Sequence, residues 1–214
     1  MTDYITPDRL HSALLTIDVQ RDFILSGSPA QMPRALEVIP AIEELVIAYR
    51  KQTLPVIHVV RLYLPDGSNV DICRRGLIEE GTRIVVPGSA GAELMEELNI
   101  SPDVPLDTKR LLKGQFQALG EKEWIMYKPR WGAFYATPLE SHLRDLGITT
   151  LVVCGCNFPN CPRTTIYEAS ERDFRIVLIT DATSGVYRQG TEEMKNIGVA
   201  LMTAREWNQK NPTT

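Results

Sequence analysis

The stretch TTLVVCGCNFPNCPRTTIYEA, residues 149–169, combines an apolar run, a short loop and the start of a helical pattern. Residues 151–156, LVVCGC, form a continuous apolar run after two threonines, which is typical of a strand buried on both faces of a parallel sheet. Pro162 favours the first turn of a helix, because proline has no N–H to lose there and its φ is already helical. We therefore predict a strand at 149–156 and a helix at 162–172.

Similar apolar runs recur along the chain, and helical patterns lie between them. Strands are expected at 13–19, 54–62, 123–128, 149–156, 175–182 and 197–204, and helices at 34–51, 137–146, 162–172 and 189–196. This alternation predicts an α/β fold with a parallel sheet. The least regular segment, 64–117, is expected to hold an extended loop, a short helix at 91–98 and an additional short strand at 83–86.

The composition is that of an ordinary globular chain, with 43% hydrophobic and 23% charged residues, and 214 residues fit a single domain over 1–214. The net charge of −4 and the absence of a Lys/Arg run argue against nucleic-acid binding. No apolar run approaches the roughly 20 residues of a membrane span, and no secretion signal is visible. We therefore expect a cytoplasmic protein, whose cysteines are more often catalytic, metal-bound or buried than disulfide-bonded.

Three residues with useful chemistry follow strand ends, namely Asp18, Lys128 and Cys161. Ligands of open parallel sheets bind beyond the carboxyl ends of the strands, so we expect these side chains at one edge. Cys161 is expected to cap the helix that Pro162 opens, where the helix dipole would lower the pKa of the thiol. A buried inert thiol is the alternative, and a zinc site is disfavoured because C-x-C-x4-C lacks the usual short cysteine pairs.

Three segments in this order also resemble a known family. LLTIDVQRDF (14–23), KPRWGAF (128–134) and GCNFPNCPRTTIYEA (155–169) are similar to motifs of the isochorismatase-like cysteine hydrolases. That superfamily includes nicotinamidases and N-carbamoylsarcosine amidohydrolase. The resemblance runs from about residue 13 to residue 203.

The resemblance implies a catalytic triad of Asp18, Lys128 and Cys161. It also implies a cis peptide between Cys156 and Asn157, which would turn the backbone N–H groups of Asn157 and Cys161 toward an oxyanion. The implied fold is a three-layer α/β/α sandwich with a six-stranded parallel, Rossmann-like sheet in the order 3-2-1-4-5-6. A homodimer or homotetramer is the expected assembly.

Aromatic and basic residues near the strand ends are the expected walls of a substrate pocket: Phe23, Arg61, Tyr63, Trp131, Phe134 and Phe158. Arg61 and Arg130 are candidates to pair with a substrate carboxylate. The pair Arg74–Arg75 suits a subunit contact as well as a substrate contact. Nicotinamidases carry an Asp-x-His metal site after the second strand, whereas VVRLYLPDGSNVD (59–71) has no histidine. We therefore expect neither a metal nor another cofactor.

Together these features predict a cysteine-dependent hydrolase that cleaves an amide or carbamoyl C–N bond of a small molecule through a thioester. One alternative is hydrolysis of a cyclic amide, as in the streptothricin hydrolases of the same superfamily. A second is a non-catalytic oligomer that binds a small molecule. A third is a thiol-redox protein, although the chain lacks a C-x-x-C arrangement.

Overall fold

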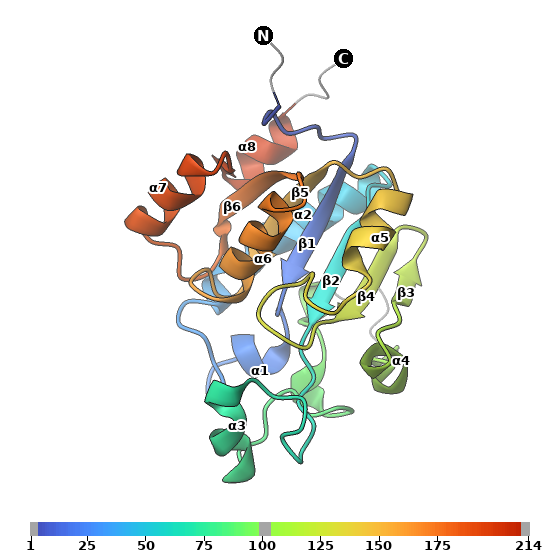
Figure 1. Cartoon of the computed structure of the whole chain (residues 1–214), viewed down its shortest axis with the longest axis vertical. Helices are drawn as coiled ribbons and strands as arrows, with labels where there is room; N and C mark the ends of the chain where they lie inside the picture. Colours follow the sequence, from blue (N-terminus) through green and yellow to red (C-terminus); the bar gives the residue numbers. More distant parts are fainter. Residues whose placement is uncertain (1–3, 99–103, 211–214) are drawn as a thin grey trace.

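The computed structural model describes residues 4–98 and 104–210. Within them a seven-stranded sheet has the order β3-β4-β2-β1-β5-β6-β7 (Figure 1). The strands are β1 (Ser12–Ile17), β2 (Val56–Val60), β3 (Gln117–Gly120), β4 (Glu123–Tyr127), β5 (Thr150–Gly155), β6 (Arg175–Thr183) and β7 (Ala200–Met202). Every neighbouring pair is parallel except β3 and β4, which are antiparallel at one edge.

The six parallel strands have the predicted order 3-2-1-4-5-6 when they are counted along the chain without β3, so this prediction is confirmed. The seventh strand is a correction, because β3 adds a short antiparallel edge. The strand predicted at 83–86 is wrong. Val85 has a φ of 41°, and its N–H donates to Asp22 Oδ2 at 2.6 Å instead of to a neighbouring strand. Ile84 and Val85 are nevertheless buried, which explains their apolar character.

The central strands are covered on both faces. Every residue of β1, β2 and β5 is buried, which is why their sequences are continuous apolar runs without alternation. Burial of these side chains is the main stabilising contribution to the sheet, at roughly 25 cal/mol for each Å² of apolar surface removed from water.

Helices form one layer on each face of the sheet (Figure 1). The helices α5 (Leu139–Asp145), α6 (Cys161–Ser170) and α7 (Arg188–Asn196) share one hydrophobic cluster with the sheet. The helices α2 (Ile39–Lys51) and α8 (Ala204–Gln209) share the other. The predicted three-layer α/β/α sandwich is therefore confirmed.

Shorter elements lie at and beyond the carboxyl end of the sheet, where α1 and α3 appear at the bottom of Figure 1. They comprise α1 (Arg21–Ile24), α3 (Ile72–Glu79), α4 (Thr108–Leu112) and the 3-10 turns η1 (Leu36–Val38), η2 (Ala90–Ala92) and η3 (Glu96–Leu98). The helix expected at 91–98 is thus two separate short turns. None of the helices in 4–98 and 104–210 has the length and apolar character needed to cross a membrane.

Candidate active site

The three strand-end residues meet at the carboxyl edge of the sheet. Asp18 follows β1, Lys128 follows β4, and Cys161 is the first residue of α6. Lys128 Nζ donates to Asp18 Oδ2 at 2.9 Å, and the charges of both residues act on the Cys161 thiol. All three are buried, with 4%, 0% and 6% of their surface exposed for Asp18, Lys128 and Cys161.

Backbone hydrogen bonds hold the strand tips in line beneath this cluster. Cys156 N–H donates to Ile17 O at 2.9 Å, Asp18 N–H to Val59 O at 2.9 Å, and Lys128 N–H to Val60 O at 3.0 Å. These bonds run from the end of β5 across β1 and β2 to the end of β4. The relative positions of Asp18 and Lys128 are therefore set by the sheet itself, whereas Cys161 follows β5 after the loop 156–160.

Asp18 adopts an unusual backbone conformation at the end of β1. Its φ is 54°, in the left-handed region that costs a non-glycine residue on the order of 1 kcal/mol and that Asp tolerates better than most. Its Oδ2 is held by Lys128, whereas Oδ1 is buried with no hydrogen-bond partner among the described residues. An unpaired carboxylate oxygen beside a thiol is placed to accept a proton.

The environment of Cys161 differs from the prediction in two ways. The helix begins one residue earlier than expected, because Asn160 is the N-cap and Pro162 is the second helical residue. Burial, followed by the Asp18 carboxylate, raises the pKa of the Cys161 thiol to about 12, because Lys128 and Arg61 oppose this only in part. The predicted lowering of this pKa is therefore wrong, since desolvation and the Asp18 carboxylate outweigh the two cationic side chains.

Gly155 allows the loop before Cys161 to lie directly against β1. Its φ is +113°, and an added Cβ would lie 2.2 Å from Ile17 O, so no other residue fits. Within this loop Phe158 N–H donates to Ser184 O at 2.7 Å. The N–H groups of Asn157 and Cys161 donate to no other group in the described part of the chain, so both remain available for an oxyanion.

The cis peptide expected between Cys156 and Asn157 is absent, because the described residues contain no cis peptide bond. The trans form is favoured by about 2.5–4 kcal/mol when the second residue is not proline. The expectation of a cis bond was therefore wrong.

A small pocket opens onto Cys161. Its walls are Asp18, Phe23, Met32, Arg74, Trp131, Cys156, Asn157, Asn160 and Cys161. The pocket has room for about one water molecule. Phe23 and Trp131 were predicted to line it. Met32 was missed, and Arg74 was left open between a subunit contact and a substrate contact, because both belong to irregular segments whose positions no sequence periodicity reveals.

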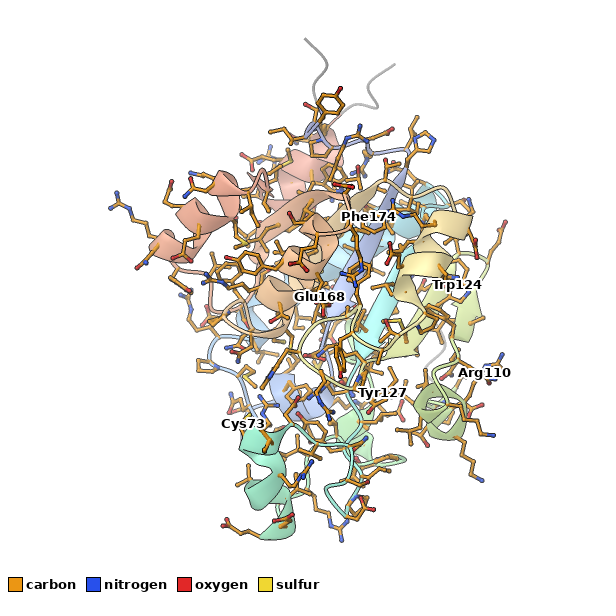
Figure 2. All side chains as sticks on the ribbon, in the orientation of Figure 1. Cys73, Arg110, Trp124, Tyr127, Glu168 and Phe174 are labelled. Atoms are coloured by element: carbon orange, nitrogen blue, oxygen red, sulfur yellow. The ribbon has the colours of Figure 1, made fainter. Side chains whose placement is uncertain are left out.

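The other predicted pocket residues do not line this pocket. Phe134 packs on Phe174 with ring centroids 5.8 Å apart, and its N–H donates to Glu168 of α6 at 2.9 Å (Figure 2 labels Glu168 and Phe174). Phe158 is fully buried against Tyr187. Both phenylalanines are buried in the hydrophobic cluster that the sheet shares with α5, α6 and α7.

Arg61 and Tyr63 belong to a buried polar network beside the pocket. The Arg61 guanidinium forms an ion pair with Asp71 and donates to Tyr63 Oη at 3.0 Å, and Tyr63 Oη donates to Asp71 Oδ2 at 3.2 Å. Burial lowers the pKa of Arg61, but the charges around it outweigh this and raise it. Arg130 donates to Asn69 O at 3.1 Å. Both arginines expected to bind a substrate carboxylate are thus engaged within the protein.

The remaining candidate ligands are spread out. Among the residues in 4–98 and 104–210, no three His, Cys, Asp or Glu side chains gather as a metal-binding group. His58 lies in the core, where its ring nitrogens bond to Thr16 Oγ1 and Glu123 Oε1, both at 2.8 Å. All four cysteines are free thiols.

The fold and the site together define an α/β sandwich protein with a buried Asp–Lys–Cys cluster at the carboxyl edge of its sheet. The sequence model of the isochorismatase domain matches residues 12–206. The chain belongs to the isochorismatase family, which confirms the resemblance found in the sequence.

Three relatives illustrate the breadth of this similarity. A probable inactive nicotinamidase of Arabidopsis thaliana is 32% identical over 94% of this chain and 96% of its own length. An isochorismatase family protein of Desulfovibrio vulgaris superposes with a TM-score of 0.78 at 32% identity, over 91% of this chain and 95% of that one. N-carbamoylsarcosine amidase of Thermoplasma acidophilum shares the fold, with a TM-score of 0.69 at 22% identity over 90% and 96% of the two chains.

Proposed function

We propose that this protein is a cysteine-dependent hydrolase that cleaves an amide or carbamoyl C–N bond of a small molecule through a thioester intermediate. The observation that carries the proposal is the buried Lys128–Asp18 ion pair beside the Cys161 thiol. The amidase of Thermoplasma acidophilum, which has the same fold, supports C–N chemistry. The name of the Arabidopsis relative, a probable inactive nicotinamidase, argues against nicotinamide as the substrate here.

The first step is transfer of the thiol proton to Asp18. Because burial raises the pKa of Cys161 to about 12, the resting nucleophile is a thiol that must lose its proton as the substrate binds. Asp18 Oδ1, which has no hydrogen-bond partner in the described chain, accepts that proton. The Lys128 ammonium, 2.9 Å from Asp18 Oδ2, then stabilises the thiolate.

Attack forms an S–C bond at the substrate carbonyl and moves the π electrons onto oxygen. The free N–H groups of Asn157 and Cys161 stabilise this oxyanion, and each such donor is worth about 10²–10³ in rate. Collapse breaks the C–N bond, and protonated Asp18 gives its proton to the leaving nitrogen. The product of this half-reaction is a thioester on Cys161 and a free amine or ammonia.

Water completes the cycle. Asp18, again a carboxylate, removes a proton from the water that attacks the thioester carbon. The C–S bond breaks, the acid is released, and the proton held by Asp18 returns to the Cys161 sulfur. Lys128 exchanges no proton in this scheme, and its ammonium offsets the negative charges of Asp18 and of the thiolate.

A non-catalytic small-molecule binder is the second candidate function. It is favoured by the raised pKa of Cys161, because a thiol that rests fully protonated is a poor nucleophile. The pocket beside Cys161 would then serve binding alone. The two candidates differ in one observable, which is covalent attachment of the substrate acyl group to sulfur.

Acid quenching during turnover of a panel of small amides and carbamoyl compounds tests the proposal. We expect intact-mass spectra to show the acyl increment on Cys161, and Cys161→Ala to lose both the increment and at least about 99.9% of turnover. Cys73→Ala is the matched control, because Cys73 is exposed. Turnover by Cys161→Ala above a thousandth of wild type would exclude the covalent route. Release of a ring-opened product without ammonia would identify the cyclic-amide alternative.

A further inference from the structure

The helix α3 brings one basic side chain to the candidate active site. It lies beyond the carboxyl end of the sheet (Figure 1), and Figure 2 labels Cys73 near its first turn. The next residue, Arg74, lines the pocket together with Cys161 and Trp131. No feature of the mechanism above uses Arg74.

Arg74 is held in a defined orientation. Its guanidinium carbon lies 5.0 Å from the centroid of the Trp131 ring, and its Nη1 donates to Tyr63 Oη at 2.9 Å. Tyr63 is itself fixed, because it also contacts Arg61 and Asp71 through hydrogen bonds. A guanidinium stacked on an aromatic face and held by one hydrogen bond keeps its other N–H groups free for a ligand.

The charges around the pocket do not cancel. Lys128 is paired with Asp18, and Arg61 is paired with Asp71. Arg74 forms no ion pair with any carboxylate among the described residues. The pocket wall therefore carries one uncompensated positive charge, and an anionic group on the substrate would compensate it.

We propose that Arg74 determines specificity at this site by binding a carboxylate of the substrate, so that the substrate class is small amides or carbamoyl compounds that carry an acid group. The part of this proposal that concerns substrate turnover rests on the proposed function. The binding of an anion beside Cys161 does not depend on it. Planar guanidinium groups recognise carboxylates through two parallel hydrogen bonds, which gives geometric selectivity as well as affinity. The pocket has room for only about one water molecule, so side chains of its wall must move to admit even a compact acid.

Two alkylating reagents of equal reactive chemistry and different charge test the anion site directly. In both reactions the Cys161 thiolate forms an S–C bond, the C–I bond breaks and iodide leaves. The measured quantity is the rate of Cys161 carboxymethylation by iodoacetate divided by the rate of its carbamidomethylation by iodoacetamide. Peptide mass spectrometry resolves Cys161 from the other cysteines, and free cysteine in the same buffer gives the intrinsic ratio of the two reagents.

We expect the ratio for wild type to exceed that of free cysteine, and Arg74→Met to lower it by about tenfold or more, as for loss of a charge-assisted hydrogen bond. Arg74→Lys should keep part of the preference, because it retains the charge but not the planar donor pair. Arg75→Met is the matched control on the same helix, because Arg75 does not line the pocket, and it should leave the ratio unchanged. An equal ratio in wild type and Arg74→Met would overturn the proposal.

Substrate pairs then separate the two proposals. N-carbamoylglycine and its methyl ester differ only in the acid group, so wild type should bind or turn over the acid preferentially, and Arg74→Met should lose that preference. If no substrate is turned over but the alkylation ratio still depends on Arg74, the hydrolase proposal is refuted and the anion-site proposal is supported. Equal turnover of acid and ester by wild type would refute the anion site and leave the hydrolase standing. Where neither reagent reaches Cys161, the shift in melting temperature caused by each compound replaces the alkylation ratio, with the same expected dependence on Arg74.

Discussion

Lys128 and Asp18 lie 110 positions apart in the sequence, and Lys128 Nζ nonetheless donates to Asp18 Oδ2 at 2.9 Å in the interior of the protein. Both side chains are almost completely buried. Removing two charges from water is costly, and a buried pair is tolerated only because each partner compensates the other. The pair is thus both the centre of the proposed chemistry and a point at which the fold is sensitive to substitution.

Lys128→Met should destabilise the protein by about 3–5 kcal/mol, because it leaves the Asp18 carboxylate buried and unpaired. The double variant Asp18→Asn/Lys128→Met should be more stable than Lys128→Met, because it removes both charges. Urea unfolding followed by circular dichroism measures the difference. Arg34→Met is the control, because the pair of Arg34 with Glu37 is exposed and its loss should change the stability little. A Lys128→Met protein as stable as wild type would show that the buried Asp18 carboxylate does not need the Lys128 ammonium.

Alkylation of Cys161 should be slow at neutral pH and should still accelerate at pH 9, by about tenfold per pH unit while the thiolate is the minor form. The reason is that burial, together with the Asp18 carboxylate, raises the pKa of the thiol to about 12. Asp18→Asn removes a negative charge that raises this pKa, so the variant should react faster than wild type at a given pH. Site-resolved rates with iodoacetamide measure both effects. A plateau near pH 6 in the unliganded protein would show an activated thiolate and contradict the raised pKa.

Acid should weaken the fold through Glu123, at the start of β4. Burial raises the pKa of this carboxyl, but hydrogen bonds from Arg50 and His58 outweigh it and lower the pKa to about 2. A carboxyl whose pKa is lower in the folded state stabilises the protein above its unfolded pKa, and that contribution is lost as the pH falls from about 4.5 toward 2. Urea midpoints measured between pH 6 and pH 2.5 should therefore fall less steeply for Glu123→Gln than for wild type. Parallel curves for the two proteins would rule out this linkage.

Gly155→Ala should destabilise the protein more than Gly27→Ala. Both glycines have positive φ, at +113° and +78°, so both substitutions strain the backbone by on the order of 1 kcal/mol or more. At Gly155 the new Cβ would also lie 2.2 Å from Ile17 O, whereas nothing lies within 4 Å at Gly27. The melting temperatures of the two variants separate the effects, because Gly155→Ala adds both a clash and backbone strain and Gly27→Ala adds backbone strain alone. Equal melting temperatures would show that β1 and the loop can separate without cost.

The sheet could be predicted from the sequence because its central strands are buried on both faces, which leaves continuous apolar runs. The edge strand β3 was missed, since only one of its four residues is buried and its sequence carries no clear period. The segment 83–86 was misread for the opposite reason, because its apolar residues are buried without forming a strand. Apolar residues in a sequence indicate burial. They indicate a strand only where the buried segment is also a strand.

Some features of the candidate site could likewise be predicted from the sequence, and others could not. Asp18, Lys128 and Cys161 could be located because each follows a strand end and lies in a recognisable motif. The pKa of Cys161 was predicted in the wrong direction, because its desolvation depends on side chains from several distant segments. Arg61 was chosen over Arg74 as a carboxylate receptor for the same reason. Only the structure reveals that Asp71 neutralises Arg61 and that no described carboxylate neutralises Arg74.

The residues that are hydrogen-bonded to the strand ends and the segment that contains α3 differ in how freely their sequences can change. Cys156, Asp18 and Lys128 are tied through their backbones to neighbouring strands, so a shift of any one of them would disrupt the sheet. The helix α3, which carries Arg74, belongs to an irregular segment outside the sheet. If Arg74 has the proposed role, exchanging that segment between relatives would change which anions bind beside Cys161 and would leave the backbones of Asp18 and Lys128 in place.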